Sequence, residues 1–184
     1  MKYREMAGEK ISVLGFGCMR FPTTSKNAED IDAEKSAKML EYAIENGVNY
    51  FDTAYVYHGG KGESFIGGVL KPYRDKIHIA TKCPTWEVKC EEDFDRLLNE
   101  QLERLQTDYI DFYLMHALDK DRFENVVEKF NLIDKLNKAK ADGKIRHIGF
   151  SFHDDVETLK KIIDANPNWE FCQIQLNYIN VKYQ

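Results

Sequence analysis

Long hydrophobic runs, closely spaced cysteines and an excess of positive charge are all missing from this sequence of 184 residues. No stretch stays apolar over the roughly 18 residues that a transmembrane helix needs. The charged start of the chain, Met1 to Gly8, has no apolar core of the kind found in signal peptides. We therefore expect a cytoplasmic protein without a membrane partner.

The cysteines are far apart and include no C-x-x-C pair: Cys18, Cys83, Cys90 and Cys172. Disulfide frameworks and zinc sites use closer spacings, so we expect neither disulfides nor a metal site. The chain carries 26 Lys and Arg against 31 Asp and Glu, a net charge of −5. Phosphate binding requires clustered positive charge, so this balance argues against a nucleic-acid partner.

What the sequence does contain is an alternation of short apolar runs with longer amphipathic patterns. Strand-like runs are Ser12–Gly17, Asn49–Ala54, Ile77–Thr81, Tyr109–Met115, Ile145–Ser151 and Phe171–Leu176. Helical patterns follow the first five, for example over 33–46 and as an apolar stripe from Phe123 to Leu136. Repeated strand–helix units predict a parallel sheet, and no linker divides residues 1–184.

Two common architectures share this alternation, a doubly wound open sheet and a (β/α)8 barrel. A doubly wound nucleotide-binding fold carries G-x-G-x-x-G after its first strand, but Gly15-Phe16-Gly17-Cys18-Met19-Arg20 lacks the third glycine. A phosphate loop of the G-x-x-x-x-G-K-[ST] type is also absent. We therefore predict an α/β fold of the (β/α)8 TIM-barrel type, with a hairpin over Met1–Lys10 that caps the barrel bottom.

A complete barrel needs eight strands and about 250 residues, whereas this chain supplies six strand-like runs. Open strand edges are an aggregation hazard that closed barrels avoid. We therefore expect residues 1–184 to form a single domain that is the first three-quarters of a longer protein, truncated after the sixth strand.

Polar side chains follow successive strand-like runs. Asp52 and Tyr57 follow the second run, Lys82 the third and His116 the fourth, and in a barrel these ends converge on one mouth. A lysine ammonium near a phenol favours the phenolate and lowers its pKa, and a carboxylate beside the lysine holds it in place. The four residues predict acid–base chemistry at a carbonyl oxygen, with His116 orienting that oxygen.

The other histidines and two loop aromatics are expected to have structural roles. His58, His78, His147 and His153 are expected to be packing or surface histidines. Trp86 and Tyr55 lie in loops near the predicted mouth, and for both a packing role is favoured over a place in the substrate wall.

Several longer motifs resemble the aldo/keto reductase family. They are Asp52-Thr53-Ala54-x-x-Tyr57 with Gly59-Gly60 and Glu63, Ile79–Lys82, Leu102–Leu105 with Asp108–Asp111 and Leu114–His116, and Gly143–Ser151. The resemblance implies a barrel that reduces an aldehyde or ketone with NADPH, less often NADH. Tyr57 would donate the proton and Lys82 would lower its pKa. Asp52 would hold Lys82, and His116 would orient the carbonyl of a small-molecule substrate.

The resemblance also implies residues for the cofactor, which would deliver the hydride. Ser151 and Gln173 match the family positions that hold the nicotinamide carboxamide, and Gln173 outranks Gln175. Phe152 stands where the family usually has asparagine, which puts one carboxamide contact in doubt. The family's nicotinamide-stacking aromatic and phosphate-binding residues lie past the sixth strand, so the choice between NADP and NAD stays open.

The segments Tyr57–Lys61 and Phe150–His153 are similar to a family branch that often carries a C-terminal iron–sulfur extension. A 4Fe–4S cluster is therefore an expectation only for a chain that continues beyond residue 184. Two other functions stay open, a non-catalytic nucleotide-sensing or scaffold subunit on the same barrel and an inactive fragment of the enzyme. The sequence determines neither the physiological substrate nor the oligomeric state.

Overall fold

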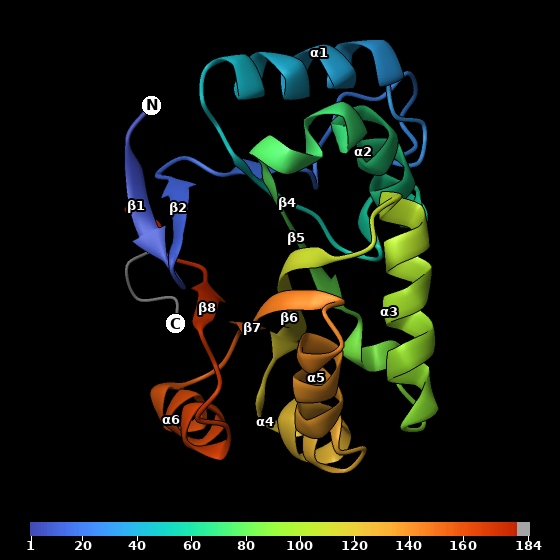
Figure 1. Ribbon diagram of the computed structural model, residues 1–184. Helices are drawn as coiled ribbons and strands as arrows, with labels where there is room; N and C mark the ends of the chain where they lie inside the picture. Colours follow the sequence, from blue (N-terminus) through green and yellow to red (C-terminus); the bar gives the residue numbers. More distant parts are fainter. Residues whose placement is uncertain (180–184) are drawn as a thin grey trace.

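The computed structural model describes residues 1–179, and its central feature is a curled sheet of parallel strands (Figure 1). Within these residues the sheet has six strands, whose order in space, β3-β4-β5-β6-β7-β8, equals their order in the chain. Their bounds are β3 (Phe16–Gly17), β4 (Tyr50–Asp52), β5 (His78–Cys83), β6 (Ile110–Leu118), β7 (Ile145–Phe152) and β8 (Phe171–Ile174). A doubly wound sheet would reverse its order part-way, so this order confirms the predicted barrel-type fold.

Helices cover the outer face of the sheet, along the top, right and bottom of the view in Figure 1. They are α1 (Ala33–Glu45), α2 (Gly62–Leu70), α3 (Glu92–Leu105), α4 (Lys120–Arg122), α5 (Leu132–Ala141) and α6 (Val156–Ala165). Leu40, Leu98 and Leu136 are buried from these helices in one core with Phe51, Tyr113 and other strand residues. None of the helices in residues 1–179 combines the length and apolar character that a bilayer crossing needs.

The stripe from Phe123 to Leu136 does not form the single helix that its spacing predicts. After α4 the chain makes a π-helical turn, Phe123–Glu128, and α5 begins only after Asn131. Asn131 has a left-handed backbone with φ of 53°, a conformation that interrupts an α-helix and that asparagine adopts more readily than most residues.

The amino-terminal residues form the predicted hairpin of β1 (Tyr3–Met6) and β2 (Glu9–Ser12). Ile11 packs against Ala80, Phe112 and Leu114 on the inner face of the sheet. Asn49, which precedes β4, accepts the backbone N–H of Ser12 at 2.7 Å. The hairpin therefore closes the amino-terminal end of the curled sheet, and the predicted cap is confirmed.

The first strand is much shorter than its apolar run, Ser12–Gly17, predicts. Ser12 ends the hairpin, and only Phe16 and Gly17 pair with β4. Val13 and Leu14 between them are each 61% exposed. Ser12 pairs with Tyr3 in the hairpin, and its bonds with Asn49 tie the hairpin to the start of β4. The run is therefore divided between two elements.

A charge cluster fastens the amino-terminal ends of β5, β6 and β7. The carboxylate of Asp111 is buried, accepts the Ile79 N–H at 2.9 Å, and pairs with Arg74 at 2.7 Å and Arg146 at 3.2 Å. Burial opposes the charged carboxylate, but the contacts from His78, Arg74 and Ile79 outweigh it and lower the pKa of Asp111. Polar residues at this end of a barrel serve stability.

Asp111→Asn should lower the free energy of unfolding by about 3 kcal/mol, because two arginines lose their shared carboxylate. Urea denaturation at neutral pH measures the loss. Since the folded-state pKa is lowered, the contribution is present above the ordinary value of 3.8 and is lost as pH falls through the folded value. The gap between variant and wild type should narrow in acid. An equal loss in the exposed control Asp75→Asn would contradict this assignment.

Candidate active site

A pocket of about 660 Å³ opens at the carboxyl ends of the strands, where the active sites of barrels lie. Among the residues that line it are Tyr57, Lys82, His116, Ser151 and Gln173. Asp52 is bonded to Lys82 beside the pocket. The structure therefore brings together all six site residues that the sequence singled out.

Lys82 and Asp52 form a buried ion pair between β5 and β4. Lys82 Nζ lies 2.8 Å from each carboxylate oxygen and donates to the backbone oxygen of Thr53 at 2.7 Å. The Lys82 side chain is only 3% exposed and that of Asp52 15%. Burial raises the pKa of the Asp52 carboxyl, and bonds from Lys82 and the Gln173 side chain offset part of this rise.

Tyr57 begins the 3₁₀ turn Tyr57–Gly60 after β4. Lys82 Nζ lies 5.2 Å from the centroid of its ring, and the His116 ring meets it edge-on at 6.4 Å. Burial raises the pKa of Tyr57 to about 12, with Asp52 and Cys18 adding to the rise. The expectation that Lys82 lowers this pKa is wrong for this structure. The ammonium is paired with both oxygens of Asp52, so its charge is compensated before it reaches the phenol.

His116 is a half-buried, neutral histidine near the end of β6. Burial lowers its pKa to about 3, and the charges of Lys82 and Arg122 add to this effect. Its Nδ1 has no hydrogen-bond partner within residues 1–179, and Trp86 packs on the ring at 5.0 Å. A neutral imidazole carries one N–H donor, which suits hydrogen bonding to a carbonyl oxygen.

Ser151 and Gln173 stand on neighbouring strands, β7 and β8, where they pair in register. The Ser151 hydroxyl oxygen accepts the Ala117 N–H at 2.7 Å, which leaves its hydrogen to be donated. The Gln173 side chain is bonded to the Asp52 carboxylate. An amide that donates through its nitrogen keeps its oxygen as an acceptor, so the two residues offer one donor and one acceptor.

The pocket wall contains residues that the sequence did not assign to it. Trp86 and His153, expected to pack or lie at the surface, both line the pocket. Met19 and Val56 line it as well, and no motif marks either of them. Only their positions in the sequence could have indicated a place in the pocket wall, because each lies in a loop after a strand that ends at this mouth.

Other side chains have the packing roles predicted for them. His58 holds the loop before α1, with Nδ1 2.7 Å from Ala28 O and Nε2 accepting the Phe21 N–H at 3.3 Å. Tyr55 lies under the Arg104 guanidinium, 4.1 Å from its ring centroid, and donates to Glu100 at 2.8 Å. His78 and His147 stack on Phe112, edge-on and face-on respectively.

Comparison with known proteins decides the family. The model of the aldo/keto reductase family matches residues 13–184. The chain belongs to this family. Among curated relatives, a probable aldo-keto reductase of Glycine max is 32% identical over 153 residues, covering 78% of this chain and 42% of that protein. The methylglyoxal reductase YeaE of Escherichia coli is 31% identical over 141 residues, covering 75% of this chain and 47% of that protein.

Solved structures agree with this family. A thermostable aldo-keto reductase crystallised with the inhibitor epalrestat has a TM-score of 0.78 at 30% identity, covering 96% of this chain and 63% of that one. An aldo-keto reductase from Bacillus halodurans has a TM-score of 0.77 at 28% identity, covering 96% of this chain and 58% of that one. The chain spans about half the length of the curated relatives it matches.

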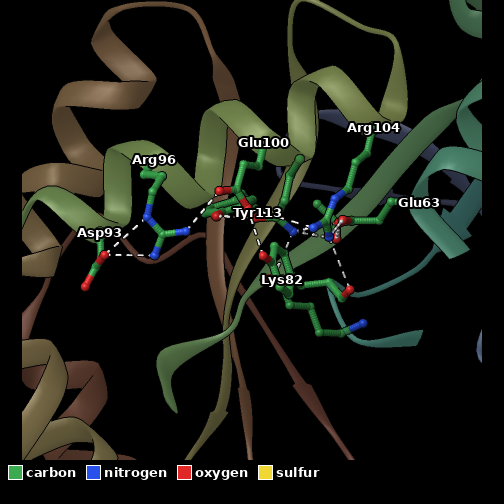
Figure 2. Close-up of polar contacts among 10 residues, drawn as sticks. Glu63, Lys82, Asp93, Arg96, Glu100, Arg104 and Tyr113 are labelled. Atoms are coloured by element: carbon green, nitrogen blue, oxygen red, sulfur yellow. Dashed lines mark hydrogen bonds and ion pairs between the residues drawn. The ribbon is translucent and has the colours of Figure 1, made fainter. Parts of the chain in front are cut away.

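In this aldo/keto reductase chain, a second polar network holds the backbone of Lys82 from the helix side (Figure 2). Glu63 of α2 accepts from the Thr81 hydroxyl and the Gln101 amide, each at 2.6 Å. The same Gln101 nitrogen lies 3.1 Å from the backbone oxygen of Lys82, and Arg104 pairs with Glu63 at 3.4 Å. In Figure 2 the Lys82 side chain extends away from these groups. The strand that carries the lysine is therefore held on both faces.

Glu63→Gln should lower the free energy of unfolding by about 2 kcal/mol, because an acceptor of three buried or half-buried donors is replaced by a group with only one oxygen. Thermal or urea unfolding measures the change. Glu103→Gln on the exposed side of α3 is the matched control, and we expect it to unfold like the wild type. Equal unfolding of Glu63→Gln and wild type would show that the network contributes nothing to stability.

Proposed function

We propose that the protein reduces a small aldehyde or ketone to the alcohol with a nicotinamide cofactor. The observation that carries this proposal is the grouping, in one pocket, of a protonated phenol, a buried Lys–Asp pair and a neutral imidazole. Membership of the aldo/keto reductase family supports it. A relative named methylglyoxal reductase points to the same class of substrate.

The pocket residues fit a nicotinamide, which supplies a hydride when bound. A carboxamide presents one carbonyl acceptor and one NH2 donor. The Ser151 hydroxyl and the Gln173 oxygen offer the complementary donor and acceptor on adjacent strands. Solved structures of the same fold from Klebsiella pneumoniae were crystallised with NADP or NADPH.

A metal cofactor is not part of this proposal. Among residues 1–179, no three His, Cys, Asp or Glu side chains gather as metal ligands would. The iron–sulfur cluster named above concerns residues after 184 and stays a prediction.

In the proposed reaction Tyr57 gives its phenolic proton to the carbonyl oxygen as that oxygen becomes an alkoxide. His116 donates a hydrogen bond to the same oxygen and fixes its direction. Lys82 stands over the Tyr57 ring at 5.2 Å from the centroid, and this cation–π contact helps to hold the phenol in place. Asp52 keeps the lysine in that position through two bonds of 2.8 Å.

Tyr57→Phe should abolish turnover of an aromatic aldehyde and leave cofactor binding within about twofold of wild type, because only the transferable proton is removed. Fluorescence titration with NADPH and an absorbance assay of its oxidation measure the two properties. Tyr42→Phe, at a tyrosine 67% exposed on α1, is the control that should keep both. Retained turnover in Tyr57→Phe would remove the proposed role. NADPH binding by the unaltered chain without reduction of any aldehyde would favour the non-catalytic subunit.

The pH dependence should follow the protonation of Tyr57. A proton donor works while it is protonated, and a pKa raised to about 12 keeps Tyr57 protonated through the neutral range. We expect the rate of carbonyl reduction to be flat from about pH 6 to 9 and to fall only in strong base. Alcohol oxidation needs the phenolate, so its rate should rise over the same range. Steady-state kinetics in both directions check this, and a decline in reduction near pH 7 would contradict it.

A further inference from the structure

The strand that carries His116 is distorted at the next residue. Ala117 has a left-handed backbone with φ of 54°, and the pairing of β6 with β7 shifts between Met115 and Leu118. The other non-glycine residues with positive φ in residues 1–179 lie in turns and at helix ends: Ala7, His58, Gln106 and Asn131. Left-handed backbone is unfavourable for a residue with a Cβ, so its surroundings hold Ala117 in place.

The distortion changes which way the strand faces. Phe112 and Leu114 pack on the inner face, while Tyr113 and Met115 belong to the core under the helices. Strict alternation would turn Leu118 inward, yet it is buried in the outer core. Alternation from Phe112 and Leu114 already turns His116 toward the pocket. The extra residue adds Ala117 to the pocket wall beside it and returns Leu118 to the core, as a β-bulge does.

Three polar side chains from three other elements hold the peptide groups around this bulge. Thr85, in the 3₁₀ turn Thr85–Glu87, donates to the His116 backbone oxygen at 3.0 Å. Ser151 of β7 accepts the Ala117 N–H at 2.7 Å. Arg122 of α4 donates to the Ala117 oxygen at 2.9 Å. Each side chain binds backbone adjoining the imidazole and not the imidazole itself.

The arginine is itself held in position. Arg122 Nη1 donates to Asp119 Oδ2 at 2.7 Å. The other oxygen of that carboxylate, Oδ1, accepts the backbone N–H of Arg122 at 2.8 Å. Thr85 is fully buried. The backbone on both sides of the Ala117 N–H is therefore held by contacts from the 3₁₀ turn Thr85–Glu87, from β7 and from α4.

We propose that Thr85 and Arg122 are positioning residues, which hold the bulge at Ala117 and so aim the His116 imidazole at the substrate carbonyl. Ser151 has the same task in addition to the cofactor contact proposed for it. This inference rests on the proposed function, since it assigns His116 a role in orienting substrate.

The test compares Thr85→Val with Thr85→Ser. Valine keeps the shape and loses the hydroxyl, whereas serine retains the donor to His116. We expect Thr85→Val to lower kcat/KM for an aromatic aldehyde by roughly tenfold or more, as misplacement of a reacting group does. NADPH affinity should stay within about twofold, and Thr85→Ser should recover most of the lost activity.

Arg122→Met is a second, independent test of the positioning role. Its matched control is Arg96→Met, because Arg96 also pairs with an aspartate three residues earlier, at 2.8 Å from Asp93. Both variants lose an ion pair with an aspartate three residues earlier, and Arg96→Met also loses the pair with Glu100 at 2.9 Å. Of the two arginines, only Arg122 contacts the bulge. We expect a loss of kcat/KM in Arg122→Met alone, with similar thermal unfolding of both.

A readout independent of turnover is the NMR spectrum of the His116 ring nitrogens, assigned by comparison with His116→Gln. In the wild type the ring should stay neutral throughout the folded range, since its pKa is lowered to about 3. In Thr85→Val, which removes no charge, a ring released toward solvent should begin to titrate nearer the ordinary value of 6.5.

The outcomes separate this proposal from the proposed function. If Thr85→Val and Arg122→Met keep wild-type kcat/KM and ring signals while Tyr57→Phe is inactive, the positioning role is wrong and the reductase function stands. If Tyr57→Phe remains active, the proposed function fails, and the ring signals still decide whether the contacts hold His116. A shifted ring with unchanged kinetics also overturns the catalytic importance of this positioning.

Discussion

The buried pair of Lys82 and Asp52 is the interaction around which the mouth of the sheet is arranged. The ammonium has three donors, and all of them reach acceptors on or just after β4: two carboxylate oxygens and the backbone oxygen of Thr53. Two charges are removed from water here, and the cost is offset only because the geometry is complete. The pair joins the ends of β4 and β5, and the turn that bears Tyr57 follows a few residues after Thr53.

The same lysine is constrained from the other face of its strand. Gln101 bonds the Lys82 backbone oxygen, the Thr81 hydroxyl and Glu63 at once, and Tyr113 donates to its oxygen at 2.7 Å. These groups approach because α2 and α3 pack closely at Gly67, where a Cβ would lie 2.6 Å from the Arg104 backbone oxygen. The Lys82 side chain can keep one position only if the backbone that carries it is fixed. The contacts from α2 and α3 fix that backbone.

Much of this arrangement could be predicted from the sequence because it depends on local period and on strand ends. The alternation of runs and the ends at Lys82 and His116 gave the parallel sheet and the residues that gather at its mouth. The predicted extent of the first strand was wrong, because the apolar run Ser12–Gly17 does not show that Ser12 is bonded to Asn49. The prediction that Lys82 lowers the pKa of Tyr57 was wrong for a similar reason. The effect of Lys82 on this pKa depends on how fully Asp52 compensates the lysine charge. That depends on the distances from Lys82 Nζ to the two Asp52 oxygens, which the sequence spacing does not show.

The bulge at Ala117 is a further feature that no local pattern could show. Alanine is an ordinary strand residue, and its left-handed backbone exists because Thr85, Ser151 and Arg122 arrive from separate parts of the chain. Local preference and tertiary contact disagree at this point, as they commonly do where function requires an uncommon geometry. The conflict lies beside the histidine, where two successive residues, His116 and Ala117, line the pocket before Leu118 returns to the core.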